Sequence, residues 1–96
     1  MAYELRLAPV ARSQITEFIS EFDAGWQLEA LEAVHEQLRR LAGDPRLGRI
    51  LSGSFSRPLF RFEIRVEGVV YYRQVVYRYS QDEKAIEITG FGPVPF

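Results

Sequence analysis

Residues 59–79 place the strongest restriction on how this chain can fold. The segments 59–66 (LFRFEIRV) and 69–79 (VVYYRQVVYRY) alternate apolar or aromatic side chains with polar ones, and Glu67 and Gly68 separate them. Alternation with a period of two is typical of strands that bury one face, and a two-residue connection ending in glycine is typical of a tight hairpin. We therefore predict two long antiparallel strands.

Each predicted strand has two faces. In the first strand, the apolar face holds Phe60, Phe62, Ile64 and Val66, and the other face holds Leu59, Arg61, Glu63 and Arg65. In the second strand, one face holds Val70, Tyr72, Gln74, Val76 and Arg78, and the other holds Tyr71, Arg73, Val75, Tyr77 and Tyr79. If helices cover the apolar face of the first strand, Arg61 and Arg65 lie on the open face of the sheet.

The residues before this hairpin predict a short strand and two helices. Residues 3–7 alternate with a period of two, and Pro9 suits the first turn of a helix. Two apolar stripes at helical spacing follow, the second in a helix over 26–42 for which Asp23 is the expected N-cap. The first stripe consists of Ala11, Ile15, Phe18, Ile19 and Phe22, and the second of Leu31, Val34, Leu38 and Leu41.

The remaining segments complete the single domain that we predict over residues 1–96. Residues 46–58 are polar and dotted with glycine, which is typical of a loop, and residues 85–89 (AIEIT) predict a last strand. The tail 90–96 carries two glycines and two prolines, so we do not expect a helix there. The predicted fold is α+β in the order β-α-α-β-β-β, with a helical hairpin packed on one face of a small, mainly antiparallel sheet.

Composition limits the kinds of site that the chain can form and the cellular compartment in which we expect it. It has no cysteine, which excludes disulfides and thiolate metal sites and favours the cytoplasm. Its apolar runs fall short of the ~20 residues that a membrane-spanning helix needs, and its first residues do not resemble a secretion signal. The lone histidine, His35, has no second histidine or cysteine nearby and so predicts no metal site. We expect no cofactor and no membrane association.

Charge is distributed unevenly along the chain. The net charge is −1, but residues 1–45 hold four arginines against eight acidic residues, and residues 46–78 hold seven arginines against Glu63 and Glu67. A basic segment of this kind can mark a surface that faces a polyanion. It can equally mean that the two halves of the chain attract each other, and both interpretations stay open.

The order of these elements resembles the RelE/ParE superfamily of type II toxin–antitoxin toxins. Residues 44–48 (DPRLG) and 51–53 (LSG) follow the helical hairpin and precede the sheet, as in that superfamily. Within it, the segment 59–65 (LFRFEIR), Gly68, Tyr72-Arg73 and Gly90-Phe91 resemble the HigB branch. The resemblance covers nearly the whole chain and implies a bacterial toxin that acts in the cytoplasm.

This resemblance implies a choice between two activities. Toxins of the RelE and HigB types cut mRNA at the ribosome without metal, whereas the ParE type poisons DNA gyrase and lacks nuclease residues. All are usually neutralised by a small antitoxin protein. The first expectation is therefore an endoribonuclease that inhibits translation, with an antitoxin, the ribosome and mRNA as partners. Nuclease branches also carry a basic C-terminal segment, but Lys84 is the last basic residue of this chain. The alternative is a non-nuclease protein of this fold, either a gyrase poison or a relic that binds only its antitoxin.

Metal-free RNA cleavage needs a proton acceptor for the 2′-hydroxyl and cations beside the phosphate. Arg65 and Arg73 are the candidate catalytic cations because guanidinium binds phosphate through two hydrogen bonds, and Glu63 is the candidate proton acceptor. The candidate RNA-binding residues are Arg61, Arg78, Tyr71 and Tyr77, the tyrosines by stacking on bases. The alternatives are an ordinary ladder of Arg–Glu pairs across the strands, and tyrosines that belong to the core.

The apolar tail supplies a candidate surface for a protein partner. Phe91, Val94 and Phe96 are more apolar than a small domain is expected to leave uncovered. The partner would be either the antitoxin or a second copy of the chain, which would make a homodimer. The alternative is that the tail folds back over the helices.

Overall fold

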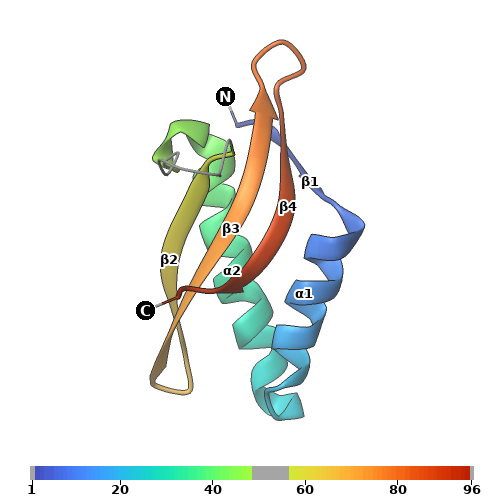
Figure 1. Ribbon diagram of the computed structural model, residues 1–96. Helices are drawn as coiled ribbons and strands as arrows, with labels where there is room; N and C mark the ends of the chain where they lie inside the picture. The colour runs from blue at the N-terminus through green and yellow to red at the C-terminus, as the bar shows by residue number, and fades with distance from the viewer. Residues whose placement is uncertain (1, 49–56, 96) are drawn as a thin grey trace.

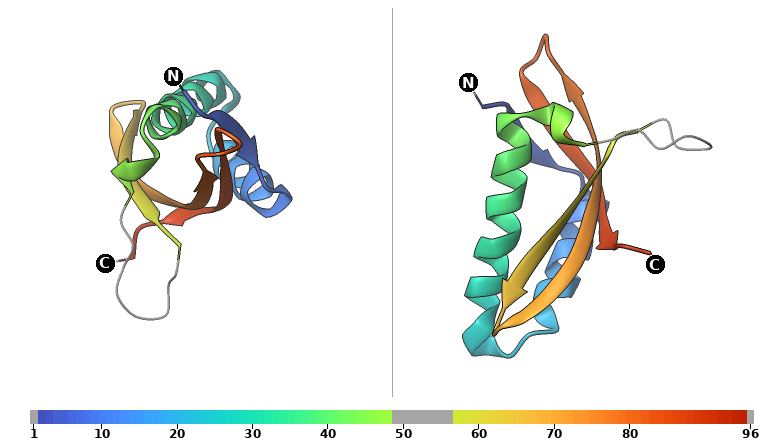
Figure 2. Two further views of the ribbon diagram at one scale, coloured as in Figure 1. Left: turned by 90° about the horizontal axis from the view of Figure 1, so that it is seen from above. Right: turned by 90° about the vertical axis from the view of Figure 1, so that its left-hand side faces the viewer.

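Two helices pack on one face of a four-stranded sheet (Figure 1). The computed structural model describes residues 2–48 and 57–95. The elements in chain order are β1 (Glu4–Leu7), α1 (Pro9–Ser20), α2 (Ala24–Gly43), a short 3-10 turn (Pro45–Leu47), β2 (Leu59–Val66), β3 (Val69–Ser80) and β4 (Ala85–Pro93). The predicted order β-α-α-β-β-β is confirmed, and both helices lie on the same side of the twisted sheet (Figure 2).

The sheet has the strand order β1-β4-β3-β2. The strands β2, β3 and β4 form an antiparallel meander, and β1 pairs parallel to β4. The turn between β2 and β3 is the predicted Glu67-Gly68 pair, and both residues have positive φ, 54° and 75°. Two left-handed residues match the twist of a hairpin, and glycine adopts this conformation without a steric penalty.

The two helices bury the faces that helical spacing predicts, with one shift. In α1, Ala11, Ile15 and Phe18 are buried. In α2, the predicted Val34, Leu38 and Leu41 are buried, but Ala30 takes the buried position expected for Leu31, which is 42% exposed. A small side chain at the buried position lets the helix lie close to the sheet, and Leu31 turns toward the flank. Asp23 does occupy the N-cap position of α2, but its side chain makes no capping hydrogen bond.

A bulge in β4 decides how the end of the chain packs. The register passes from Tyr77 opposite Ile88 to Val76 opposite Gly90, so Thr89 is an extra residue in β4. The extra residue allows Ile88 and Phe91, three positions apart, to face the helices together. The strand therefore continues to Pro93, beyond the predicted end at residue 89.

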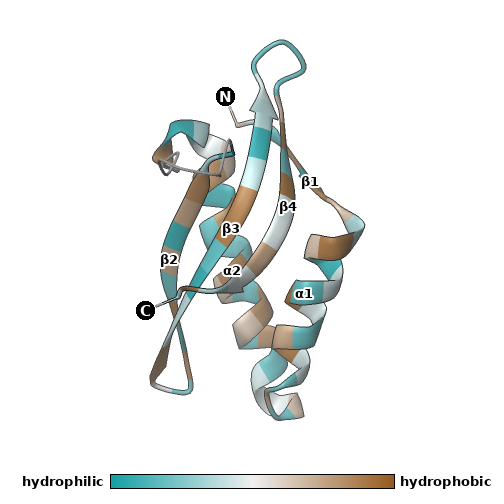
Figure 3. Cartoon of the chain, viewed as in Figure 1, coloured by the Kyte–Doolittle hydropathy of each residue, from teal (hydrophilic) through white to brown (hydrophobic). Residues whose placement is uncertain are grey.

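The core lies between the helices and the inner face of the sheet. Hydrophobic and hydrophilic residues alternate along β2, as Figure 3 shows, and Phe60, Phe62, Ile64 and Val66 are the buried set on its inner face. Tyr77 is fully buried in β3. Among the described residues, no helix is both long enough and apolar enough to cross a membrane.

Candidate functional site

The side of the sheet that the helices leave uncovered holds several of the predicted anion-binding residues. Arg61, Glu63 and Arg65 alternate along β2 with exposed side chains, as predicted. The register between β2 and β3 sets Arg61 beside Gln74 and Glu63 beside Tyr72. We call this surface the open face and define it by Glu4, Arg6, Arg61, Glu63, Arg65, Tyr72, Gln74, Arg78 and Glu87.

The β2 part of the open face places two cations on either side of one carboxylate. Successive residues on one face of a strand are about 6.6 Å apart, so Arg61 and Arg65 flank Glu63 at equal distances. The guanidinium of Arg61 is oriented by Gln74, because its Nε donates to the Gln74 Oε1 at 3.1 Å. An exposed, oriented guanidinium can bind a phosphate group through two hydrogen bonds.

In the part of the open face formed by β1 and the neighbouring strands β4 and β3, the arginines form ion pairs with glutamates. The Nη2 atom of Arg78 lies 2.6 Å from Oε1 of Glu87, and Nη2 of Arg6 lies 2.9 Å from Oε2 of Glu4. The hydrogen bond from Arg6 to Glu4 raises the pKa of the Arg6 guanidinium. Because its charge is already paired, Arg78 is a weaker anion ligand than the sequence alone suggests.

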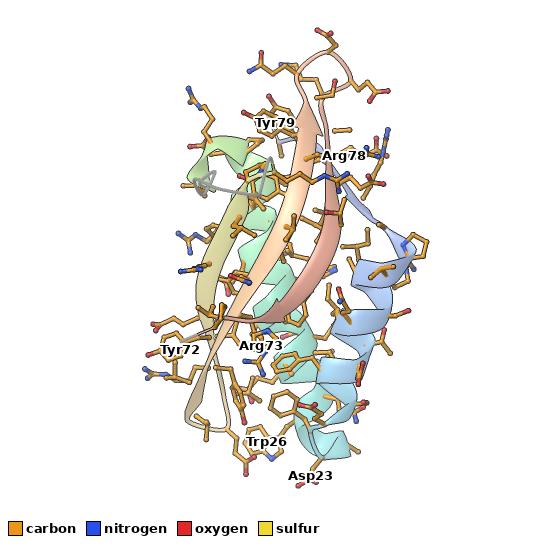
Figure 4. The ribbon with its side chains drawn as sticks, viewed as in Figure 1. Asp23, Trp26, Tyr72, Arg73, Arg78 and Tyr79 are labelled. Carbon is orange, nitrogen blue, oxygen red and sulfur yellow. The ribbon has the colours of Figure 1, made fainter. Side chains whose placement is uncertain are left out.

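Arg73 does not join Arg65 and Glu63. It pairs in register with the buried Phe62, so its side chain lies on the helix side of the sheet (Figure 4). There its guanidinium carbon is 4.5 Å from the centroid of the Phe18 ring, and its Nη1 donates to the Tyr72 carbonyl at 2.8 Å. The prediction that Arg65 and Arg73 together form the catalytic cations is therefore corrected, because the two side chains lie on opposite faces of the sheet and cannot contact the same phosphate.

The two predicted base-stacking tyrosines also belong to the helix side. Tyr71 is half-buried, with its ring centroid 5.9 Å from that of Phe18 and 5.3 Å from that of Phe22. Tyr77 is 0% exposed, so its ring cannot stack on a base, and the expectation is corrected. The aromatic residue of the open face is Tyr72, which is 48% exposed. The prediction missed it, although alternation along β3 places it beside Gln74.

The predicted partner-binding tail is largely part of the core. Phe91 is 6% exposed, and its ring packs against Phe18 and Phe62 at centroid distances of 5.5 and 6.5 Å. Its N–H donates to Oε1 of Gln14 at 2.8 Å, which ties β4 to α1. For Phe91 the structure therefore supports the alternative, in which the tail packs against the helices, and not the partner-binding surface. Val94 is half-buried, and Phe96 lies outside the described residues.

A shallow groove runs between α2 and β2. It encloses about 540 Å³, and its lining includes Leu31, His35, Arg39 and Arg65. His35 is exposed on α2. Within residues 2–48 and 57–95, no group of three histidine, aspartate or glutamate side chains could hold a metal ion.

Comparison with known proteins identifies the fold. No protein-family model matches the chain, and no curated protein matches it. Among solved structures, it is similar to a mutant of the E. coli toxin RelE in the free state, in which two arginines are replaced by alanine. The TM-score is 0.55 at 13% identity, over 97% of this chain and 84% of that chain. The chain therefore has a RelE-like fold, and its α+β architecture is confirmed.

Proposed function

We propose that this protein is the toxin of a type II toxin–antitoxin pair. The observation that carries the proposal is the likeness of 97% of the chain to the E. coli toxin RelE, from the first strand to the last. The order of β1, the helical hairpin and the antiparallel meander agrees with the resemblance that the sequence motifs indicate. An antitoxin protein is the proposed partner, and the cytoplasm is the proposed place of action.

The proposed target is mRNA at the ribosome, and the proposed contact is the β2 part of the open face. Arg61 and Arg65 would hold the phosphate, and their charges would stabilise its pentavalent transition state. Glu63, between them, would accept the proton of the 2′-hydroxyl as the 2′-oxygen bonds to phosphorus. The bond from phosphorus to the 5′-oxygen would break, and the departing oxygen would take a proton from water or from the protonated Glu63, leaving a 2′,3′-cyclic phosphate. Tyr72 would offer an exposed ring for stacking. Arg73 has no part in this site because it lies on the other side of the sheet. Membership of the HigB branch belongs to the same proposal.

A second candidate is a binding protein of the same fold that does not cut RNA. It is favoured by the charge of the open face, where four arginines (Arg6, Arg61, Arg65 and Arg78) meet three glutamates (Glu4, Glu63 and Glu87). A nearly neutral surface attracts a polyanion weakly. Such a protein would act on gyrase, or would bind its antitoxin alone.

Cleavage of a defined mRNA by the purified protein, with and without translating ribosomes, tests the two candidates. The proposal predicts ribosome-dependent cleavage that falls at least tenfold when Arg61 and Arg65 are both changed to alanine. The matched control changes Arg12 and Arg46, which are exposed elsewhere, so it alters net charge equally. Growth arrest on expression of the protein in a bacterium, without cleavage of mRNA by the purified protein, would favour the second candidate. Absence of both growth arrest and cleavage would contradict the toxin proposal.

A further inference from the structure

The outer edge of β2 is unpaired within the described part of the chain. The sheet order ends at β2, and no strand among residues 2–48 and 57–95 lies beyond it. The view onto this side in Figure 2 shows β2 running obliquely beside α2. An open edge presents backbone donors and acceptors that another strand can pair with.

The hydrogen bonds of the hairpin determine which residues face that edge. The N–H of Tyr77 donates to the carbonyl of Pro58 at 3.2 Å, so position 58 and every second residue after it bond toward β3. In an antiparallel ladder the residues between them point their N–H and C=O groups the opposite way. Arg61, Glu63 and Arg65 therefore direct their backbone groups to the free edge, while their side chains stay on the open face.

The charges on the β2 edge are complementary to those on the same edge of a second copy of the chain. Two copies of β2 that run antiparallel about a two-fold axis at Phe62 place Arg61 of each copy opposite Glu63 of the other. Opposite charges directly across a strand pair stabilise it, and like charges destabilise it. An axis at Glu63 would set Arg61 against Arg65 and Glu63 against itself. An axis at Ile64 would pair fewer residues, because β2 ends at Val66. The axis at Phe62 gives both a long overlap and matched charges.

The neighbouring flank of α2 repeats this complementarity. The guanidinium of Arg40 lies 6.0 Å from the ring centroid of Phe60, so the end of α2 is near the start of β2. Arg65, near the end of β2, lines the same groove as Glu29 and Glu32 of the first half of α2, so the two elements run in opposite directions. An axis at Phe62 then passes near the middle of α2. Two antiparallel copies of the helix bring Glu32 of one near Arg39 of the other, and both residues line the groove between α2 and β2. Leu31, 42% exposed in the same groove, would be covered.

We infer that the β2 edge and the α2 groove form a homodimer interface, whose occupant is a second copy of this chain. The two sheets join into one across the two-fold axis, with all helices on the same side. The interface is isologous, so each contact occurs twice. In such a dimer Arg61 and Glu63 pair across the axis, so Arg61 would bind an anion more weakly in the dimer than in the monomer. The inference rests on the geometry and charges of the β2 edge and does not depend on the toxin proposal. This interface replaces the dimer through the aromatic tail, because Phe91 is buried in the core.

Charge reversal tests the inference with the full chain. Arg61→Glu alone and Glu63→Arg alone each set like charges opposite one another, so each is expected to weaken dimerisation by about tenfold or more. When the two variants are mixed, every reversed residue meets its opposite, and a heterodimer is expected to form with restored affinity. Sedimentation over a range of concentrations gives the association constant, and thermal unfolding of each variant shows that it is folded.

Three results would overturn the inferred dimer or its register. A wild-type protein that stays monomeric at all concentrations would overturn the inference and leave the charges as protection of an edge strand against aggregation. A dimer that neither single variant weakens would also overturn it. Restoration by mixing Glu63→Arg with Arg65→Glu, in place of Arg61→Glu, would overturn the register centred on Phe62.

Discussion

The guanidinium carbon of Arg73 lies 4.5 Å from the centroid of the Phe18 ring, so an arginine of β3 covers the aromatic core beneath α1. The cavity around this contact, about 240 Å³, is also lined by Glu17 and Glu21 of α1. The basic segment of the sequence is thus divided between the two faces of the sheet. Part of its charge faces the acidic helices, and part remains on the open face.

Replacement of Arg73 by alanine is expected to lower the free energy of unfolding by about 1–2 kcal/mol. The loss comes from the cation–π contact and from the packing of the arginine stem on the ring. Arg65→Ala removes an exposed side chain of the same strand pair and is expected to change stability by less than about 0.5 kcal/mol. Urea denaturation of both variants measures the difference. Equal effects would contradict the placement of Arg73 on the helix side.

Tyr77 is expected to anchor the 3-10 turn after α2 to the sheet. Its hydroxyl donates to the carbonyl of Pro45 and accepts the N–H of Gly48 at 3.0 Å. Tyr77→Phe removes both bonds and leaves two backbone groups without this partner, at a cost of about 1–3 kcal/mol. Hydrogen exchange at the Gly48 amide should accelerate in the variant. An unchanged exchange rate with unchanged stability would show that the anchor does not form.

The same hydroxyl gives stability a dependence on alkaline pH. Burial raises the pKa of Tyr77 above its ordinary value. The folded protein therefore holds this proton more tightly than the unfolded chain, so the contribution is complete below about pH 10 and is lost as pH rises through the folded-state pKa. Wild type should lose stability more steeply than Tyr77→Phe above pH 10. Parallel stability curves of the two proteins would contradict this role.

Gly48 is expected to tolerate no side chain. A Cβ atom built there would lie 2.1 Å from the hydroxyl oxygen and 2.5 Å from a ring carbon of Tyr77. Gly48→Ala must therefore displace a fully buried ring, and a loss of about 1–3 kcal/mol is expected. The control is Gly25→Ala, because a Cβ atom at that helical position meets nothing within 4 Å. Alanine there should be neutral or stabilising, and thermal unfolding of both variants separates the two cases.

Alternation along β2 was sufficient to predict the open face, because its inner residues are strongly apolar and its outer residues are charged. The face of Arg73 could also have been read from the sequence. A two-residue turn at Glu67-Gly68 sets Val66 opposite Val69, and counting back from it sets Phe62 opposite Arg73. Strand alternation alone did not include this step, so the arginines of the two strands were grouped together.

Two features could not be read from local patterns. The bulge at Thr89 changes which residues of β4 face the helices. Gly90 beside it is compatible with a bulge, but the same glycine also suits the start of an irregular tail, as was predicted. The bulge moved Phe91 from an expected surface into the core. The anchor of Tyr77 joins residues 29 and 32 positions apart, and such a contact exists only once the turn after α2 has docked on the sheet.

Induced expression in a bacterium, followed by pulses of labelled methionine and labelled thymidine, tests the toxin proposal most directly. The account predicts that methionine incorporation falls promptly while thymidine incorporation continues, and that changing both Arg61 and Arg65 to alanine abolishes this fall. An earlier fall in thymidine incorporation would instead indicate the gyrase-directed alternative. Normal growth with both labels unaffected would contradict the proposal that this protein is a toxin.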